Sequence, residues 1–170
     1  HRERALHRRA RAHTEAVNHR EHTQRGGRHE PVRQRQVRQP HEVFGESDRL
    51  PGVVIDQFND VIVVQINTAG MENLKSFLIT AVQTVFHPKT ILLKCDSSER
   101  KIEGLADYTE IIGDALPDLT EIKENNCIYH TALLTGQKTG WFFDHRFNRE
   151  RIATYCHNKR VLDVFSYCGA

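Results

Sequence analysis

The sequence predicts an α+β domain that is followed by the first helix and strand of a second, α/β domain. Three observations support this prediction. Two β-rich runs meet at Asn59 and Asp60, an amphipathic run follows them, and a short apolar run at 161–165 leads into a glycine-containing turn. The 170 residues, 38% of them hydrophobic, allow one domain or one domain and a piece of another. We divide the chain into residues 1–41, 42–134 and 135–170.

Residues 1–41 differ in composition from the rest of the chain. They hold eleven Arg, no Lys and four Glu, which is a net charge of +7, and they contain no aromatic residue. Residues 42–170 hold thirteen Lys and Arg against eighteen Asp and Glu, a net charge of −5, so the overall +2 does not describe a uniformly basic protein. A segment so poor in apolar residues cannot offset its ordering entropy, and we expect a basic low-complexity segment that is disordered or weakly helical.

Several roles are open for this basic segment. It can be a solvated tail, or an arm that binds RNA phosphates in a salt-dependent way. Its seven histidines are a weak metal signal, because no pair repeats at a ligand spacing. The abrupt change at Glu42, together with Arg in the absence of Lys, also resembles an out-of-frame translation. Reading the encoding DNA in the other frames would test that hypothesis.

The cysteines and the hydropathy pattern indicate the compartment. Cys95, Cys127, Cys156 and Cys168 form no CxxC pair and match no zinc spacing, so we interpret them as reduced thiols of an intracellular protein. The sequence has no run of eighteen apolar residues and no signal-peptide core. We expect a soluble cytoplasmic protein without a membrane or metal partner, and the sequence does not indicate its oligomeric state.

A hairpin and a helix open the 42–134 domain. A polar turn at Pro51-Gly52 precedes a strand at 53–58, and Asn59-Asp60 joins that strand to a second one at 61–66. Apolar residues then recur at three- and four-residue steps from 71 to 86, which predicts an amphipathic helix that Pro88 ends.

A strand, a loop and a second hairpin complete this domain. We predict a strand at 90–95, a polar loop at 96–108, and a hairpin of 119–124 with 127–134 around Asn125-Asn126. The order hairpin, helix, strand, hairpin predicts a mostly antiparallel sheet with a helix on one face. The apolar residues of these elements are expected to form its core.

The stretch TGQKTGWFFDHRFNR, residues 135–149, is the most unusual in the chain. Gly136 and Gly140 flank Lys138-Thr139, but the spacing does not match the phosphate loop of nucleotide-binding proteins. Asp144 is expected to cap a helix that places Ile152, Tyr155 and Cys156 on one face. An apolar strand with one acid, Asp163, follows at 161–165, and a strand that leads into a glycine turn is typical of nucleotide-binding doubly wound sheets.

Three motifs together resemble those of a known family. VFGESDRLPGVVIDQF, TGQKTGWFFDHRFNR and RVLDVFSYCG occur in this order in class I S-adenosylmethionine-dependent methyltransferases of ribosomal RNA. The resemblance covers about Glu42 to the end of the chain, and it is strongest to the group that methylates carbon 5 of a cytosine in the large-subunit RNA. In that family a small RNA-binding domain precedes a central α+β domain and a Rossmann-like α/β methyltransferase domain.

The resemblance implies S-adenosyl-L-methionine as cofactor and ribosomal RNA as partner. It assigns to the cofactor site two groups of residues, Lys138, Thr139, Gly140, Phe142, Asp144 and Arg146 from the first segment and Asp163, Phe165, Tyr167 and Gly169 from the second. The alternative for Arg146 and Arg149 is pairing with Asp144 or Glu150 on the helix surface, and for Phe142, Phe143 and Phe147 it is core packing.

Family features are also missing from the chain. The family's catalytic cysteine, which attacks carbon 6 of the base, matches none of the four cysteines, and Cys168 is interpreted as a packing residue. We therefore expect no catalytic residue here, a fragment without turnover, and an exposed apolar last strand with poor solubility. Two other functions stay open: a ribosomal RNA guanine methyltransferase of the same class, and a non-catalytic RNA-binding module. A remnant with no role is a further alternative.

Overall fold

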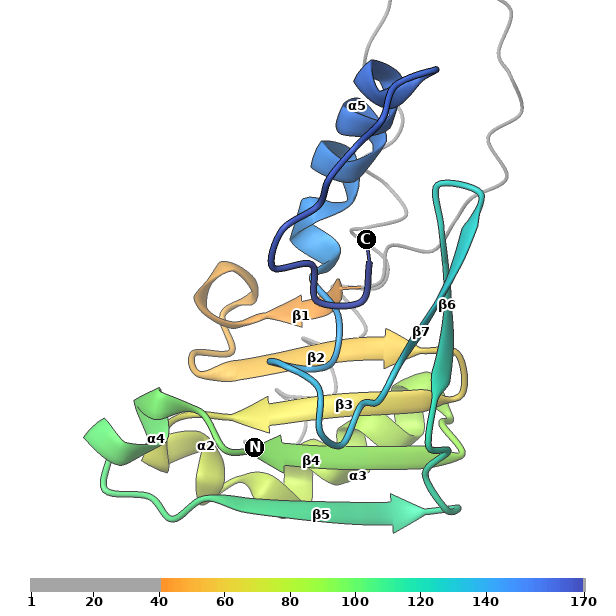
Figure 1. Ribbon diagram of the computed structural model, residues 1–170. Coiled ribbons are helices and arrows are strands. Elements are labelled where there is room, and N and C mark those ends of the chain that lie inside the picture. Colours follow the sequence, from red (N-terminus) through yellow and green to blue (C-terminus); the bar gives the residue numbers. More distant parts are fainter. Residues whose placement is uncertain (1–40, 170) are drawn as a thin grey trace, which may run out of the picture.

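The computed structural model describes residues 41–169 of the chain, and Figure 1 shows their arrangement. The basic segment, apart from His41, lies outside the described residues, and so do the predictions made for it. The first element is the strand β1 (His41–Phe44), followed by the 3-10 helix η2 (Gly45–Asp48). We expected only a polar turn before residue 53, so the described part of the chain has one more strand there than the sequence predicted.

Five strands form the main sheet, in the spatial order β1-β2-β3-β4-β5. After β1 they are β2 (Val53–Phe58), β3 (Val61–Ile66), β4 (Thr90–Cys95) and β5 (Tyr108–Gly113). Only β3 and β4 run parallel, and the other neighbours are antiparallel. The mostly antiparallel sheet is thus confirmed, with the predicted bounds of β2, β3 and β4. Asn59, in the turn between β2 and β3, has a φ of 55°.

The predicted helix is divided into two. The short α2 (Ala69–Glu72) and the longer α3 (Lys75–Phe86) are separated at Asn73 and Leu74, where Leu74 has left the helical conformation. Leu78, Ala81 and Val82 of α3 are buried against the sheet. α3 therefore covers one face of the sheet, as the periodicity predicted, and Figure 1 shows it behind the strands.

The loop predicted at 96–108 contains a helix and leads into a missed strand. α4 (Ser98–Ile102) packs through Arg100, whose guanidinium donates to the carbonyl of Ala106 and pairs with Glu72 at 2.8 Å. β5 then pairs with β4 along its whole length. Most side chains of β5 are exposed, since it is an edge strand, and so it lacks the apolar alternation that marks a strand in a sequence.

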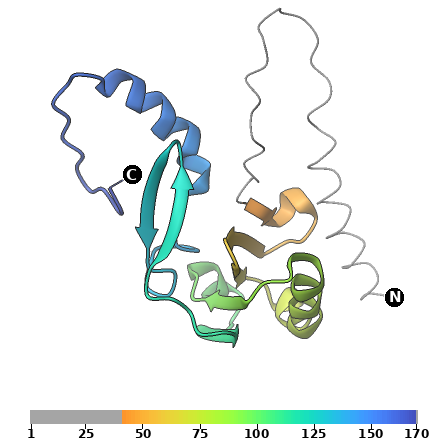
Figure 2. The same cartoon turned by 90° about the vertical axis from the view of Figure 1, so that its right-hand side faces the viewer.

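The second hairpin is confirmed. β6 (Thr120–Glu124) pairs with β7 (Cys127–Thr131) as a two-stranded sheet around Asn125 and Asn126, which both have positive φ. Seen from the side, the hairpin and the chain that follows it lie on one face of the main sheet and α3 lies on the other (Figure 2).

Each face of the main sheet has its own core. The core on the α3 side contains the side chains of Val53, Ile55, Ile62, Val64, Ile91 and Leu93, with Leu78 and Val82 from α3. The opposite core joins sheet residues to the hairpin and to the 133–143 segment, through Phe58, Val61, Val63, Leu92, Ile122, Leu133, Trp141 and Phe143. This second core holds the 135–149 stretch against the sheet.

The chain ends in a helix and an irregular segment. The 3-10 helix η3 (Phe143–His145) continues into α5 (Arg146–Cys156), in which no residue is buried. The strand predicted at 161–165 is wrong: these residues are irregular and exposed, and Phe165 has a φ of 63°. A central parallel strand depends on neighbours on both sides, and no strand within residues 41–169 pairs with this segment.

Candidate functional site

The TGQKTG turn, residues 135–140, follows β7 and is closed by its own backbone. The Gly136 amide donates to the Ala132 carbonyl at 2.7 Å, and the Gly140 amide donates to the Gln137 carbonyl at 2.9 Å. The Thr131 hydroxyl in turn donates to the carbonyl of Gly140 at 2.7 Å. These bonds close the turn into a compact shape.

Both glycines of the turn are sterically required. Gly140 has a φ of 121°, and a Cβ there would lie 2.6 Å from a methyl carbon of Leu133. A Cβ on Gly136 would lie 2.3 Å from the hydroxyl oxygen of Tyr167 and 2.6 Å from the Ala132 carbonyl oxygen. The glycines therefore serve close packing of the turn against Ala132 and Leu133, which follow β7, and against Tyr167 near the end of the chain.

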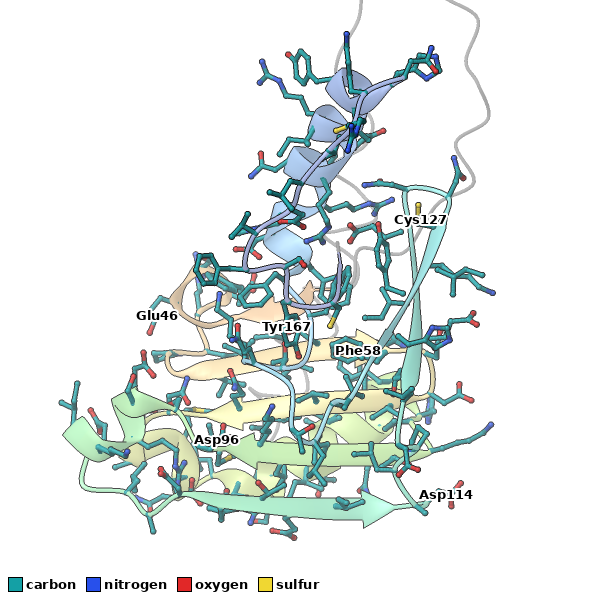
Figure 3. All side chains as sticks on the ribbon, viewed as in Figure 1. Glu46, Phe58, Asp96, Asp114, Cys127 and Tyr167 are labelled. Atoms are coloured by element: carbon teal, nitrogen blue, oxygen red, sulfur yellow. The ribbon has the colours of Figure 1, made fainter. Side chains whose placement is uncertain are left out.

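Three residues that the resemblance assigned to the cofactor lie together at this turn. Lys138, with a φ of 51°, holds its ammonium nitrogen 4.6 Å from the ring centroid of Phe142. The Phe142 ring meets the Tyr167 ring edge-on at 5.9 Å. The Tyr167 hydroxyl accepts a hydrogen bond from the Gln137 amide at 3.0 Å, and Figure 3 shows Tyr167 in front of the sheet. The structure thus brings two distant sequence segments into one aromatic and cationic cluster.

Thr139 is turned in the opposite direction. It is buried, and its hydroxyl donates to the carboxylate of Asp56 on β2. In this arrangement the side chain fastens the turn to the sheet, and only its backbone faces the turn. Its role in holding a cofactor stays a prediction.

The two candidates at the start of α5 are exposed or half-buried. Asp144 lies within η3 and approaches Nε2 of His145 at 3.6 Å, so it does not cap α5; the residue before that helix is His145, which makes no capping bond through its side chain. The carbonyl of Arg146 accepts a hydrogen bond from the Asn125 side chain at 3.1 Å. Phe147, in contrast to the buried Phe143, is exposed.

Arg149 does not make the helix-surface pair with Asp144 or Glu150 that was the alternative for it; its partner is on another element. Its guanidinium makes two hydrogen bonds to Glu124 on β6, Nε to Oε1 at 2.6 Å and Nη2 to Oε2 at 2.9 Å. It stacks 4.7 Å from the Trp141 ring and donates to the Phe142 carbonyl at 2.9 Å. Trp141 also donates to Glu124, at 3.1 Å. This largely buried cluster attaches α5 to the hairpin of β6 and β7.

The remaining candidates are not gathered at the turn. Asp163 and Phe165 are exposed, and Gly169 has a φ of 74° with open space where a Cβ would stand. Of the second group only Tyr167 contacts the turn. Cys168 packs beside it, with its sulfur 3.9 Å from the Thr131 hydroxyl, as expected of a packing residue.

Sequence reasoning missed two residues that hold the turn. Asp56 on β2 and Lys94 on β4 are buried under it, at 1% and 3% exposure. The Lys94 ammonium donates to the carbonyls of Leu133, at 3.2 Å, and of Gly136. The sequence could have indicated them, because each is the one charged residue in a mostly apolar strand, VVIDQF or TILLKC. A charge buried in a strand requires a nearby partner, and the turn provides it.

Other sites in the described part of the chain lie elsewhere or are absent. A cavity of about 350 Å³ is lined by residues of β1, η2, β2 and α4, among them Phe44, Val54 and Ile102, and it touches none of the cofactor candidates. Among residues 41–169 no group of three His, Cys, Asp or Glu side chains is arranged to hold a metal ion. No helix in this range has the length and hydropathy needed to cross a membrane.

Sequence comparison relates the chain to RNA methyltransferases. No family model matches it. It is 40% identical over 129 residues to ribosomal RNA large subunit methyltransferase I of Erwinia tasmaniensis, and 38% identical over 128 residues to the protein of that name from Aliivibrio fischeri. Each match covers 75% of this chain and 32% of the relative. The chain thus spans about a third of the length of these relatives, and the resemblance drawn from its motifs is confirmed.

Solved structures support the fold. A SAM-dependent methyltransferase from Streptococcus mutans and a methyltransferase complexed with SAH each superpose with a TM-score of 0.64 at 16% identity. Each match covers 88% of this chain and 35% of the other. At this identity the likeness concerns the fold alone, a mixed sheet with helices.

Proposed function

We propose that this chain forms one wall of the S-adenosylmethionine site of a methyltransferase that acts on large-subunit ribosomal RNA. One observation carries the proposal: the Phe142 ring of the first segment contacts both Lys138 of the same segment and Tyr167 of the second segment, 25 positions further along the sequence. These are the two segments that the resemblance assigns to the cofactor. The 40% identity to a ribosomal RNA methyltransferase supports the assignment.

The side chains present suit this cofactor in part. Aromatic faces such as those of Phe142 and Tyr167 attract a cation, and the cofactor carries a sulfonium. The exposed carboxylate of Asp144 suits an ammonium group, which the methionine end of the cofactor provides. Lys138 occupies the Phe142 face in this structure, so its side chain has to move for a cation to take that place. Asp163, Phe165 and Gly169 do not contribute to this wall as they stand.

The chemistry divides between the cofactor and the protein. When bound, the cofactor supplies an electrophilic methyl group, and this chain's residues bind and orient it. We assign no catalytic residue: the cysteine thiolate that the resemblance requires matches neither the buried Cys95 nor the packed Cys168. Cytosine carbon 5 is the proposed target atom. Guanine is the second candidate target. Identifying which nucleoside of the large-subunit RNA receives the methyl group from the methyltransferase distinguishes the two.

Calorimetric titration of the chain with S-adenosylhomocysteine, the product of the cofactor, tests the wall. We expect binding that weakens severalfold in Phe142→Ala, because the variant removes the central ring of the cluster. Ile152→Ser is the matched control, since Ile152 is exposed on α5 away from the turn's contacts. The proposal is contradicted if the native chain gives no heat of binding with S-adenosylhomocysteine. It is also contradicted if Phe142→Ala binds S-adenosylhomocysteine as tightly as the native chain.

Incubation with labelled S-adenosylmethionine and large-subunit ribosomal RNA tests whether this chain transfers a methyl group by itself. We expect no methyl transfer by this chain, because none of its residues supplies the thiolate. RNA affinity is measured on the same samples, with and without residues 1–41. RNA binding that depends on residues 1–41, in a chain that does not bind the cofactor, favours the non-catalytic RNA-binding module instead.

A further inference from the structure

Two buried charges lie on the same face of the main sheet, under the TGQKTG turn. In a strand alternate side chains share a face. Asp56 on β2 is paired across the ladder with Val63 on β3, and Val63 is paired with Leu92 on β4. Lys94 is two residues beyond Leu92, so it lies on that face too. Val63 and Leu92 belong to the core beneath the turn, which identifies the face.

The two charges hold the turn at different places. The Lys94 ammonium, on β4, donates to the carbonyls of Leu133 and Gly136, at the start of the turn. The Asp56 carboxylate, on β2, accepts the hydroxyl hydrogen of Thr139, at its end. The turn therefore crosses β3, with one anchor on each of the two strands that flank it, β4 and β2.

Stability alone does not explain these charges. Removing an ammonium and a carboxylate from water costs more than ordinary hydrogen bonds return, and apolar residues of similar volume usually serve a core at least as well. Burial also lowers the pKa of Lys94, which reflects the cost of keeping it charged there. What the charges provide is direction: each anchor bonds particular atoms of the turn segment, two carbonyls for Lys94 and one hydroxyl for Asp56.

The anchored residues flank the residue at the proposed site. Lys138 lies between Gly136 and Thr139, and it has a left-handed backbone conformation that few residues other than glycine adopt readily. Gly140, next to Thr139, has a φ of 121°. Such conformations persist where surrounding contacts impose them. With both ends held, the turn presents Lys138 over Phe142.

We propose that Lys94 and Asp56 are positioning residues that hold the 135–140 turn in its ligand-facing conformation from the sheet below. The inference rests on the proposed function for the identity of the ligand, but the positioning itself does not. Neither residue is among those that the resemblance assigns to the cofactor. Their action passes through Gly136 and Thr139 to Lys138, which makes the α+β sheet part of the cofactor site's support.

Hydrogen exchange of the native chain and two variants tests the positioning. Lys94→Met keeps the length of the side chain and removes its donors, and Thr139→Val keeps the shape and removes the hydroxyl. We expect the amides of 136–140 to lose protection at least tenfold in both variants, while the amides of β3 and β4 keep theirs. Thr139→Ser keeps the hydroxyl and loses only the methyl group, so its amides should be protected as in the native chain. If Thr139 served packing alone, the opposite would hold: Thr139→Ser would lose protection, and Thr139→Val, which keeps the shape, would retain it.

The control is Lys89→Met, which removes an exposed lysine paired with Asp60 at 2.7 Å just before β4. It should leave the turn unchanged. Protection of 136–140 that is native-like in both Lys94→Met and Thr139→Val would overturn the inference. If Lys94→Met does not fold, Thr139→Val and Thr139→Ser decide the result.

Titration with S-adenosylhomocysteine separates the two proposals. Where the native chain binds, we expect Lys94→Met to weaken binding about tenfold, and unchanged affinity would overturn the inference. Where the native chain does not bind but the variants lose protection at the turn, the positioning is supported and the assigned ligand is wrong.

Discussion

Replacing Arg149 by Met should destabilise the chain more than any surface substitution on α5. The guanidinium makes a two-pronged pair with Glu124, and the two side chains are only 14% and 3% exposed. The variant leaves the Glu124 carboxylate buried, with a hydrogen bond from the Trp141 indole N–H at 3.1 Å. It also removes the donor to the Phe142 carbonyl.

The magnitude follows from the uncompensated charge. Removing one partner of a buried ion pair costs about 3–5 kcal/mol, because the other charge keeps its desolvation penalty. A slope of about 2 kcal/mol per molar urea then lowers the unfolding midpoint by about 1.5 M or more. The apolar stem of Met retains part of the packing on the Trp141 ring, so most of the loss is electrostatic.

Urea unfolding, followed by the fluorescence of the single Trp141, measures the effect. The double variant Glu124→Gln with Arg149→Met should recover much of the loss, since it removes both charges. Glu121→Gln is the control, because it breaks the exposed pair with Lys123 at 3.1 Å and should shift the midpoint little. The reasoning is refuted if Arg149→Met shifts the midpoint no more than this control does.

Three further results are expected. Gly140→Ala should lower the melting temperature through a loss above about 1 kcal/mol, because its φ of 121° and the crowding at its Cβ exclude a side chain, whereas Gly70→Ala, in open space, should not. Burial raises the pKa of the Cys95 thiol above 9.0, so the unfolded chain releases that proton first and stability falls as pH rises from about 9. Above about pH 9 the free energy of unfolding should therefore fall more steeply with pH in the native chain than in Cys95→Ala. The comparison of the two isolates the thiol from the buried Lys94, whose lowered pKa makes stability rise with pH. Equal pH dependence of the two chains would contradict the assignment. Asn126→Gly should raise the melting temperature slightly, because Asn-Gly suits a turn with two positive φ values, and a drop would argue against that turn.

Local patterns determined much of the α+β unit. The strands at 53–58, 61–66 and 90–95 have the predicted bounds, because an apolar run between turn residues is a property of a few neighbouring residues. Both hairpins are located by their Asn turns for the same reason. The motif resemblance to ribosomal RNA methyltransferases was also readable, because it depends on residue order and not on packing.

Tertiary structure decided the features that depend on distant partners. The edge strand β5 is defined by its pairing with β4. Its residues are mostly exposed and do not alternate between apolar and polar, so its sequence does not predict a strand. The segment 161–165 has strand-like residues but no strand beside it in the described part of the chain, and it stays irregular. A strand is stable through hydrogen bonds to a neighbour, so its existence is not a local property.

The same reason applies to the candidate site. The sequence identified the turn, its glycines and its aromatic residues, and in the structure Phe142 contacts both Lys138 and Tyr167. The sequence did not identify Asp56 and Lys94 as the anchors of that turn, 83 and 42 positions from their partners, since composition does not reveal which buried charge faces which carbonyl or hydroxyl. Periodicity specifies which residues are buried, and only the packing of sheet against turn specifies what a buried charge holds.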